Sequence, residues 1–95
     1  MLVLNFQGLD IPLPTFQEIV NKSLDELVAV CKFRHHQTGW EWYVIAGETI
    51  GEEMLLFCYV KGDFNEFGYV PLYDIIDAGA MFCPTWKSRK VERLL

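Results

Sequence analysis

Short apolar runs separated by turn-forming residues fill the middle of the chain. The runs span residues 29–34, 40–45, 54–60 and 67–70, and they are rich in aromatic and β-branched residues. This composition is typical of strands, and the short connections between the runs suit hairpins. Residues 47–53 are polar and contain glycine, so we expect a loop there. The run 54–60 is apolar at successive positions, which predicts a central strand that is buried on both faces.

Two segments show the signals of helices. Thr15–Glu18 has the sequence of a capping box, in which Thr and Glu side chains bind free backbone amides of the first turn. Apolar positions then keep a period of 3.6 residues as far as Val28, although a second capping box at Ser23–Glu26 interrupts them. The sequence therefore allows either one helix or a short helix followed by a turn. The segment Pro71–Gly79 predicts a second helix of two turns.

The ends of the chain are less regular. Residues 2–6 are apolar and suit a strand or a docked terminus, and Pro12 and Pro14 predict an extended connector. Residues 86–95 are amphipathic but too short to distinguish a strand from a helix. Together the patterns predict an α+β fold, an antiparallel sheet of about four strands with one or two short helices packed on one face. A small half-open barrel is the alternative.

The composition indicates one globular domain over residues 1–95. The chain is 52% hydrophobic and 22% charged, which excludes a disordered or collagen-like protein. Two separate cores would each be too small to fold without a metal or disulfides. No apolar run approaches the roughly 18 residues of a membrane span, and the first residues do not have the pattern of a signal segment. We expect a cytoplasmic protein that does not enter membranes.

Charge is distributed unevenly along the chain. Residues 41–77 hold eight acidic residues against Lys61 alone, a net charge of −7, whereas residues 86–95 hold four bases and one acid, a net charge of +3. A net charge of −5 opposes general binding to a phosphate backbone and suits a partner protein with a basic surface. Direct nucleic-acid binding is therefore the alternative, through the basic C-terminal residues Lys87, Arg89, Lys90 and Arg93.

No arrangement of residues predicts catalysis, a cofactor or a metal ion. The three cysteines are far apart and form no C-x-x-C motif, so we expect reduced thiols buried in the core. His35 and His36 are neighbours, and neighbours on a strand point to opposite faces, which prevents them from chelating one ion. The chain has no nucleophile elbow and no phosphate-binding glycine loop. A small hydrolase would need a pair of carboxylates in a closed pocket.

The acidic segment offers the candidate protein-binding residues, which lie in its two predicted turns. They are Glu48, Glu52, Glu53, Asp63, Phe64, Asn65 and Glu66. Phe64 lies at the predicted tip of a hairpin, where it either folds back onto the sheet or stands out as an aromatic anchor between acids. In the second case, replacing Phe64 by Ala and Glu66 by Lys would abolish partner binding without unfolding the chain.

Aromatic residues make up 15% of the sequence, more than a core of this size normally encloses. Core packing accounts for most of them, and a few remain to form a binding surface. Because surplus aromatic side chains and an apolar N-terminus leave apolar surface to cover, we also predict weak self-association, as a homodimer.

Several aromatic and glycine positions, in order, resemble a bacterial family of unknown function. The matching positions are Lys32-Phe33, Trp40-Glu41-Trp42-Tyr43, Phe57, Tyr59-Val60, Gly62, Glu66, Gly68-Tyr69, Leu72 and Val91-Glu92-Arg93. The resemblance covers residues 29–95 and includes a W-x-W-Y strand and an E-x-G-Y strand leading into a short helix. The chain departs from the family at Val70-Pro71, where a serine usually begins the helix.

The resemblance implies an accessory protein of a plasmid, integrative element or phage in a bacterial host cell. Small acidic proteins of such elements are often inhibitors of host defence systems, among them CRISPR effectors and restriction enzymes. The acidic segment is consistent with such a role, since it could compete for the basic nucleic-acid channel of a nuclease. The resemblance thus favours a non-enzymatic inhibitor of a host defence nucleic-acid enzyme over a nucleic-acid-binding accessory protein.

Overall fold

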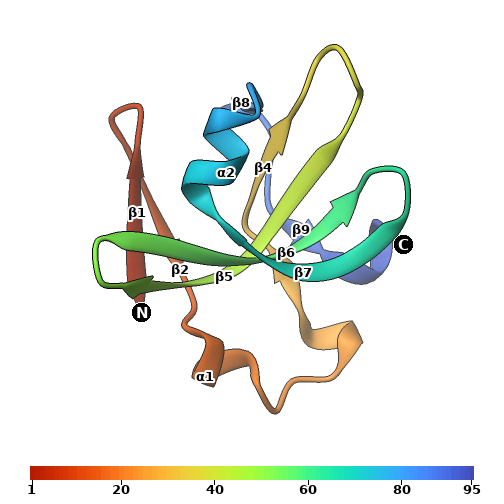
Figure 1. The fold of residues 1–95 in the computed structure, drawn as a ribbon. Helices are drawn as coiled ribbons and strands as arrows, with labels where there is room; N and C mark the ends of the chain where they lie inside the picture. The colour runs from red at the N-terminus through yellow and green to blue at the C-terminus, as the bar shows by residue number, and fades with distance from the viewer.

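A five-stranded antiparallel sheet forms the centre of the computed structural model, which describes all 95 residues (Figure 1). Its strand order is β7-β6-β5-β4-β8. The strands are β4 (Cys31–Arg34), β5 (Glu41–Ile50), β6 (Glu53–Lys61), β7 (Asn65–Pro71) and β8 (Met81–Phe82). Four strands are confirmed at the predicted places, with β6 between β5 and β7, and β8 adds a short fifth strand. The predicted run 29–34 is shorter in this sheet, because only Cys31–Arg34 belong to it and Ala29 pairs elsewhere.

The expected loop at residues 47–53 is wrong, because β5 continues to Ile50 and only Gly51 and Glu52 form the turn. The register with β6 shifts between Val44 and Ala46, where Ile45 forms a bulge, and pairing then continues to the end of both strands. Gly47 lies at a tightly packed position of the strand rather than in a turn. A Cβ atom there would lie 3.2 Å from side-chain carbons of three leucines.

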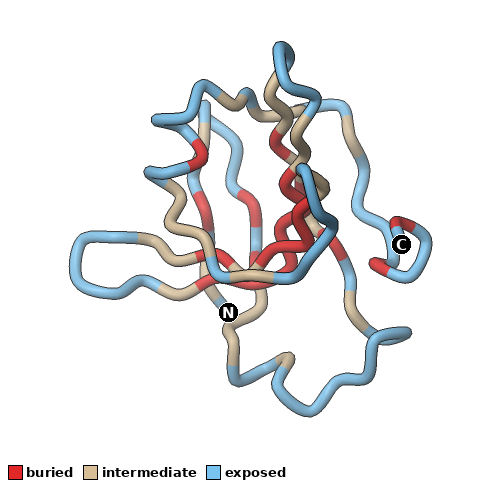
Figure 2. Tube along the Cα trace, turned by 45° about the vertical axis from the view of Figure 1, so that its right-hand side comes forward, coloured by how far each residue is buried: buried red, intermediate tan, exposed pale blue.

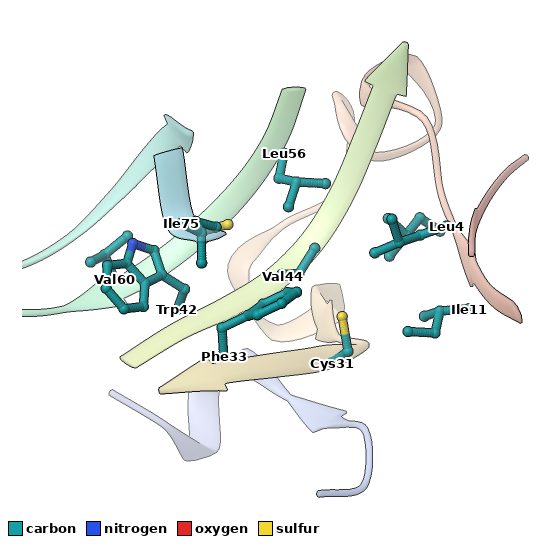
Figure 3. Packing of buried hydrophobic residues seen from close by; sticks show 11 residues of the cluster. Leu4, Ile11, Cys31, Phe33, Trp42, Val44, Leu56, Val60 and Ile75 are labelled. Atoms are coloured by element: carbon teal, nitrogen blue, oxygen red, sulfur yellow. The ribbon is translucent and has the colours of Figure 1, made fainter. Parts of the chain in front are cut away.

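One face of the sheet is covered by the N-terminal hairpin and by α2 (Leu72–Asp77). The hairpin consists of β1 (Leu2–Phe6) and β2 (Leu9–Leu13), so the predicted connector around Pro12 is instead a strand paired with β1. Figure 3 shows Leu4 and Ile11 of this hairpin, and Ile75 of α2, directed toward the sheet residues Phe33 and Val44. These side chains form the larger hydrophobic core.

The other face of the sheet carries a smaller core under two separate segments. The first contains α1 (Phe16–Ile19) and a 3₁₀ turn, η1 (Leu24–Glu26), so the alternative of a short helix followed by a turn is confirmed. In the second, β9 (Arg89–Lys90) pairs with β3 (Val28–Ala29) and leads into η2 (Val91–Arg93). The buried residues of this core are Ala29, Tyr43, Ile45, Tyr59, Val91 and Leu94.

Helical turns therefore lie on both faces of the sheet, which corrects the prediction that they pack on one face. The protein is mainly β, with two short α-helices, and it matches the predicted α+β class in that coarse sense. Buried positions concentrate in the middle of the sheet, while the hairpin ends and the segment after α1 are exposed (Figure 2). None of its helices has the length and apolar character needed to cross a membrane.

Candidate functional site

The seven predicted protein-binding residues do not form one site. Glu48, Glu52 and Glu53 lie at the end of the β5–β6 hairpin, whereas residues 63–66 lie at the other end of β6. The prediction that all four of these residues belong to a turn is corrected, because Asn65 and Glu66 already pair with β6 as the first residues of β7. These ends are separated by the length of β6, about 26 Å at roughly 3.3 Å per residue. A single small contact cannot include both groups.

Within these two groups, the side chains have different roles. Glu48 is half-buried, and its Oε1 accepts a hydrogen bond from the Phe16 amide at 3.1 Å, so it positions α1 on the sheet. Phe64 is 82% exposed, and the alternative in which it folds back onto the sheet is wrong. Glu52 and Glu53 are exposed beside α2.

The basic C-terminal residues are all exposed, but they do not form an isolated tail. Arg89 and Lys90 belong to β9, and the Arg89 guanidinium lies 4.9 Å from the centre of the Trp86 ring. A hydrogen bond from Ser23 and, to a smaller extent, the charge of Lys90 lower the pKa of Asp25. Arg89 and Lys90 thus interact with neighbouring groups of the same chain.

The cysteine and histidine side chains are dispersed. Cys31 and Cys58 are buried as predicted, and burial raises the pKa of Cys31 to about 12. Cys83 is only half-buried, so the prediction of burial is too strong for it. His35 accepts a hydrogen bond from the Thr38 amide at 3.1 Å. No three His, Cys, Asp or Glu side chains lie close enough together to hold a metal ion.

The largest hollow of the surface is an aromatic groove that the sequence did not predict as a site. It has a volume of about 500 Å³. It lies between α1 with the turn that follows it and the face of β6 and β7 that carries the smaller core. Its lining residues are Phe16, Gln17, Ile19, Val20, Lys22, Leu27, Phe57 and Tyr69. Val20 is 68% exposed and Tyr69 is 61% exposed, so apolar side chains face solvent in a concave site.

A connected row of five aromatic rings crosses the groove and extends beyond it. One ring, that of Phe16, belongs to the α1 wall, and the other four belong to the wall formed by β6 and β7. The Phe16 ring meets Tyr69 edge-on at 5.1 Å between centroids, and Tyr69 lies 5.1 Å from Phe57. Phe67 stacks on Phe57 at 5.9 Å and contacts Tyr59 at 4.9 Å. The alternation of Phe57 with Tyr59, and of Phe67 with Tyr69, places these rings on one face of neighbouring strands.

Local hydrogen bonds hold the other wall in place. The Thr15 hydroxyl accepts from the Glu18 amide, and the Glu18 carboxylate accepts from the Thr15 amide, which completes the predicted capping box. The Gly47 amide donates to the Pro14 carbonyl at 2.9 Å and fixes the approach to α1. Together with the hydrogen bond that the Phe16 amide donates to Glu48, these contacts tie α1 to β5.

A second hollow lies on the opposite side of the sheet. This acidic notch has a volume of about 420 Å³ and is lined by Glu52, Glu53, Met54, Leu72, Tyr73 and Ile76. Tyr73 is 68% exposed and Ile76 is 44% exposed. The notch therefore combines two of the predicted carboxylates with apolar surface that no element covers.

An ion pair with two flanking contacts connects three strands near the aromatic rings. Lys32 Nζ lies 2.6 Å from Glu41 Oε2, and both Lys32 and Lys61 lie over the Tyr43 ring. Burial alone would raise the pKa of Glu41, but its hydrogen bonds with Lys32 and Tyr43 and the lysine charges lower it. Burial and the charge of Glu41 raise the pKa of Tyr43. The ion pair and the two lysine–ring contacts thus join β4, β5 and β6.

Comparisons with known proteins found no match: no family model, no curated protein and no solved structure resembles this chain closely enough to be significant.

Proposed function

We propose that this protein is a protein-binding module, and that its aromatic groove receives an apolar side chain of the partner. The observation that carries the proposal is the groove itself, about 500 Å³ in volume, with Val20 and Tyr69 largely exposed. Concave sites lined by aromatic and aliphatic side chains are typical of binding sites. Covering exposed apolar side chains with a partner removes them from water and lowers the free energy, so the groove favours association.

Charge supports a protein partner over a nucleic acid. Among the groove residues only Lys22 is basic, and a strand of nucleic acid would need several cations along its phosphates. The net charge of −5 favours a partner whose surface is basic around the apolar side chain that enters the groove. Nucleic-acid binding through Lys87, Arg89, Lys90 and Arg93 stays the alternative prediction.

The acidic notch supports the same class of partner. Its carboxylates, Glu52 and Glu53, stand beside the exposed Tyr73 ring, an arrangement that suits Arg or Lys side chains with their long aliphatic stems. A nucleic-acid enzyme of a bacterial defence system has the basic surface that this chemistry requires. We therefore propose inhibition of such an enzyme, by binding rather than catalysis, as the role of the module.

The test is affinity capture from bacterial cells that carry defence systems, with matched tyrosine variants. Tyr69→Lys places a charge in the aromatic groove, and Tyr73→Lys places the same charge in the acidic notch at similar exposure. Val3→Lys, at a half-exposed position in neither hollow, is the control. We expect Tyr69→Lys to lose a protein that wild type and Val3→Lys both retain, and mass spectrometry would identify that protein.

The other outcomes separate the alternatives. Loss by Tyr73→Lys alone would assign binding to the acidic notch, and loss by the double variant Phe64→Ala, Glu66→Lys alone would assign it to the β6–β7 turn. Equal capture by wild type and folded Tyr69→Lys would exclude the groove. Gel-shift assays at low salt with single- and double-stranded DNA and RNA test the nucleic-acid alternative, which salt-sensitive binding would support.

A further inference from the structure

The long outer edge of the sheet has no partner strand. β7 is the last strand in the order β7-β6-β5-β4-β8, and it pairs only with β6. The other edge strand, β8, has two residues, whereas β7 has seven residues in unbroken register with β6. The backbone groups on the outer side of such a strand are free to pair with another strand.

Proteins usually protect long edges with charges, bulges or proline, and β7 has little of this protection. Glu66 is its only charged residue, no bulge interrupts it, and Pro71 lies at its last position. Gly68, at its midpoint, has no heavy atom within 4 Å of the position that a Cβ would occupy. The face of the sheet at the centre of β7 is therefore unobstructed, and Gly68 has no side chain that a second strand would have to avoid.

We propose that two copies of this chain associate by pairing β7 with β7 in antiparallel direction, with Gly68 of each copy opposite Gly68 of the other. This is the one register that pairs all seven residues of the strand. It places Phe67 opposite Tyr69 of the second copy, a cross-strand aromatic pair of the kind that stabilises sheets. It also places Glu66 opposite Val70, so no carboxylate of β7 faces another.

The surface available at this edge makes the dimer weak. Phe67 is 39% exposed and Tyr69 is 61% exposed, so four rings contribute about 400 Å² if a free aromatic side chain exposes about 200 Å². Stable complexes of standard size bury about 1,200–2,000 Å² in total. The net charge of −5 on each copy adds repulsion. We expect the dimer fraction to rise with protein concentration and with salt.

The joined sheet has a consequence for the aromatic groove. In this register the two copies are related by a twofold axis perpendicular to the sheet, so corresponding faces lie on the same side. Tyr69 belongs both to β7 and to the groove. The dimer would therefore present two grooves side by side, and a partner with two copies of its binding segment would bind more tightly.

A cysteine placed at the predicted axis tests the register. In a Cys83→Ser background, which leaves only the buried Cys31 and Cys58, Gly68→Cys puts a thiol at a position with free space. Residues opposite each other in antiparallel strands have Cα atoms about 4.5–5.5 Å apart, within the range for a disulfide. Under copper-phenanthroline oxidation, we expect Gly68→Cys to form a covalent dimer on a non-reducing gel.

The matched control is Glu66→Cys on the same strand. In the proposed register its two copies are offset by four residues, about 13 Å, which is too far for a disulfide. Glu66→Cys alone should stay monomeric, whereas Glu66→Cys mixed with Val70→Cys should cross-link. Met81→Cys on β8 tests the opposite edge. Equal cross-linking at positions 66 and 68, no cross-linking at 68, or a wild-type chain that sediments as a monomer at high concentration and salt would overturn the proposal.

Discussion

Trp40 packs its ring in the space where the Cβ of any residue other than glycine would stand at position 62. Such a Cβ would lie 2.7 Å from three atoms of the ring, closer than side-chain carbons approach one another. Trp40 in turn lies 6.0 Å from Trp42, a residue of the larger core. The absence of a side chain at Gly62 is therefore part of the packing at this end of the sheet.

We expect Gly62→Ala to lower the free energy of unfolding by about 1–3 kcal/mol, because Trp40 must move away from its contacts. Gly68→Ala is the matched control, since its new methyl group meets no atom within 4 Å. That change should stay within roughly 0.5 kcal/mol. Urea unfolding, followed by tryptophan fluorescence, measures both. Equal destabilisation by the two substitutions would contradict this role of Gly62.

At the residue scale, the sequence predicts burial for side chains that suit the interior of a strand. It does not predict the surroundings of residues whose contacts come from distant segments of the chain. Cys31 and Cys58 lie within strand patterns, and both are buried as predicted. Gly47 looks like a loop residue, but it lies within β5, where three leucine side chains approach the position that a Cβ would occupy. Glu48 looks like a surface acid, and its role depends on Phe16, which lies 32 residues away in the sequence.

At the level of single elements, α1 is only four residues long and depends on its cap. A helix of one turn leaves most of its first amides without helical partners, so the Thr15 hydroxyl and the Glu18 carboxylate supply essential bonds. Phe16 follows the cap directly and forms part of the groove wall through its contact with Tyr69. The cap therefore influences the shape of the groove.

Thr15→Ala should lower the free energy of unfolding by about 1 kcal/mol and weaken the contact between the Phe16 and Tyr69 rings. Nuclear Overhauser effects between the two rings report the contact, and chemical denaturation reports the stability. Ser23→Ala removes the same kind of box from η1 and serves as the control. It should reduce stability while the Phe16–Tyr69 contact persists. An unchanged contact in Thr15→Ala would show that the bonds of Glu48 and Gly47 position α1 without the cap.

Elements were predictable where local signals and tertiary pairing agree. The capping boxes at Thr15 and Ser23 both form, and the four central strands lie where aromatic and β-branched residues alternate. β2 and the second half of β5 were missed because Pro12 and Gly47 disfavour strands locally, whereas pairing with β1 and β6 overrides that preference. The β3–β9 pair joins residues about sixty positions apart, and no local pattern indicates it.

For the whole molecule, the candidate site depends on contacts between distant segments. The aromatic groove combines residues 16–27 with Phe57 and Tyr69, so a pattern along either segment describes only one wall. The predicted protein-binding residues show the opposite relation. They are close in sequence, but the structure separates them, because they lie at the two ends of β6. Sequence reasoning could therefore identify the surplus of aromatic side chains, but not the surface on which they meet.

Acid stability also depends on the whole molecule, because four carboxyl groups have lowered pKa values. Lys32 and Tyr43 lower the pKa of Glu41 despite its partial burial, and hydrogen bonds within the two capping boxes lower the pKa values of Glu18, Asp25 and Glu26. In the unfolded chain these bonds are lost and the groups return to their ordinary pKa values, 4.5 for Glu and 3.8 for Asp. Near pH 4 the unfolded chain thus binds more protons than the folded one.

The free energy of unfolding should consequently be highest well above pH 4.5 and fall as the pH drops through 4.5 toward the lowered values in the folded protein. Glu41→Gln should flatten this dependence, since it removes one of the four groups and its ion pair with Lys32. The variant should be less stable than wild type at pH 7, and the difference should shrink by pH 3.

Urea titrations across this range measure the effect, with Glu92→Gln, exposed and in no ion pair, as the control. A Glu41→Gln profile that runs parallel to wild type would show that the Lys32–Glu41 pair contributes nothing to acid unfolding.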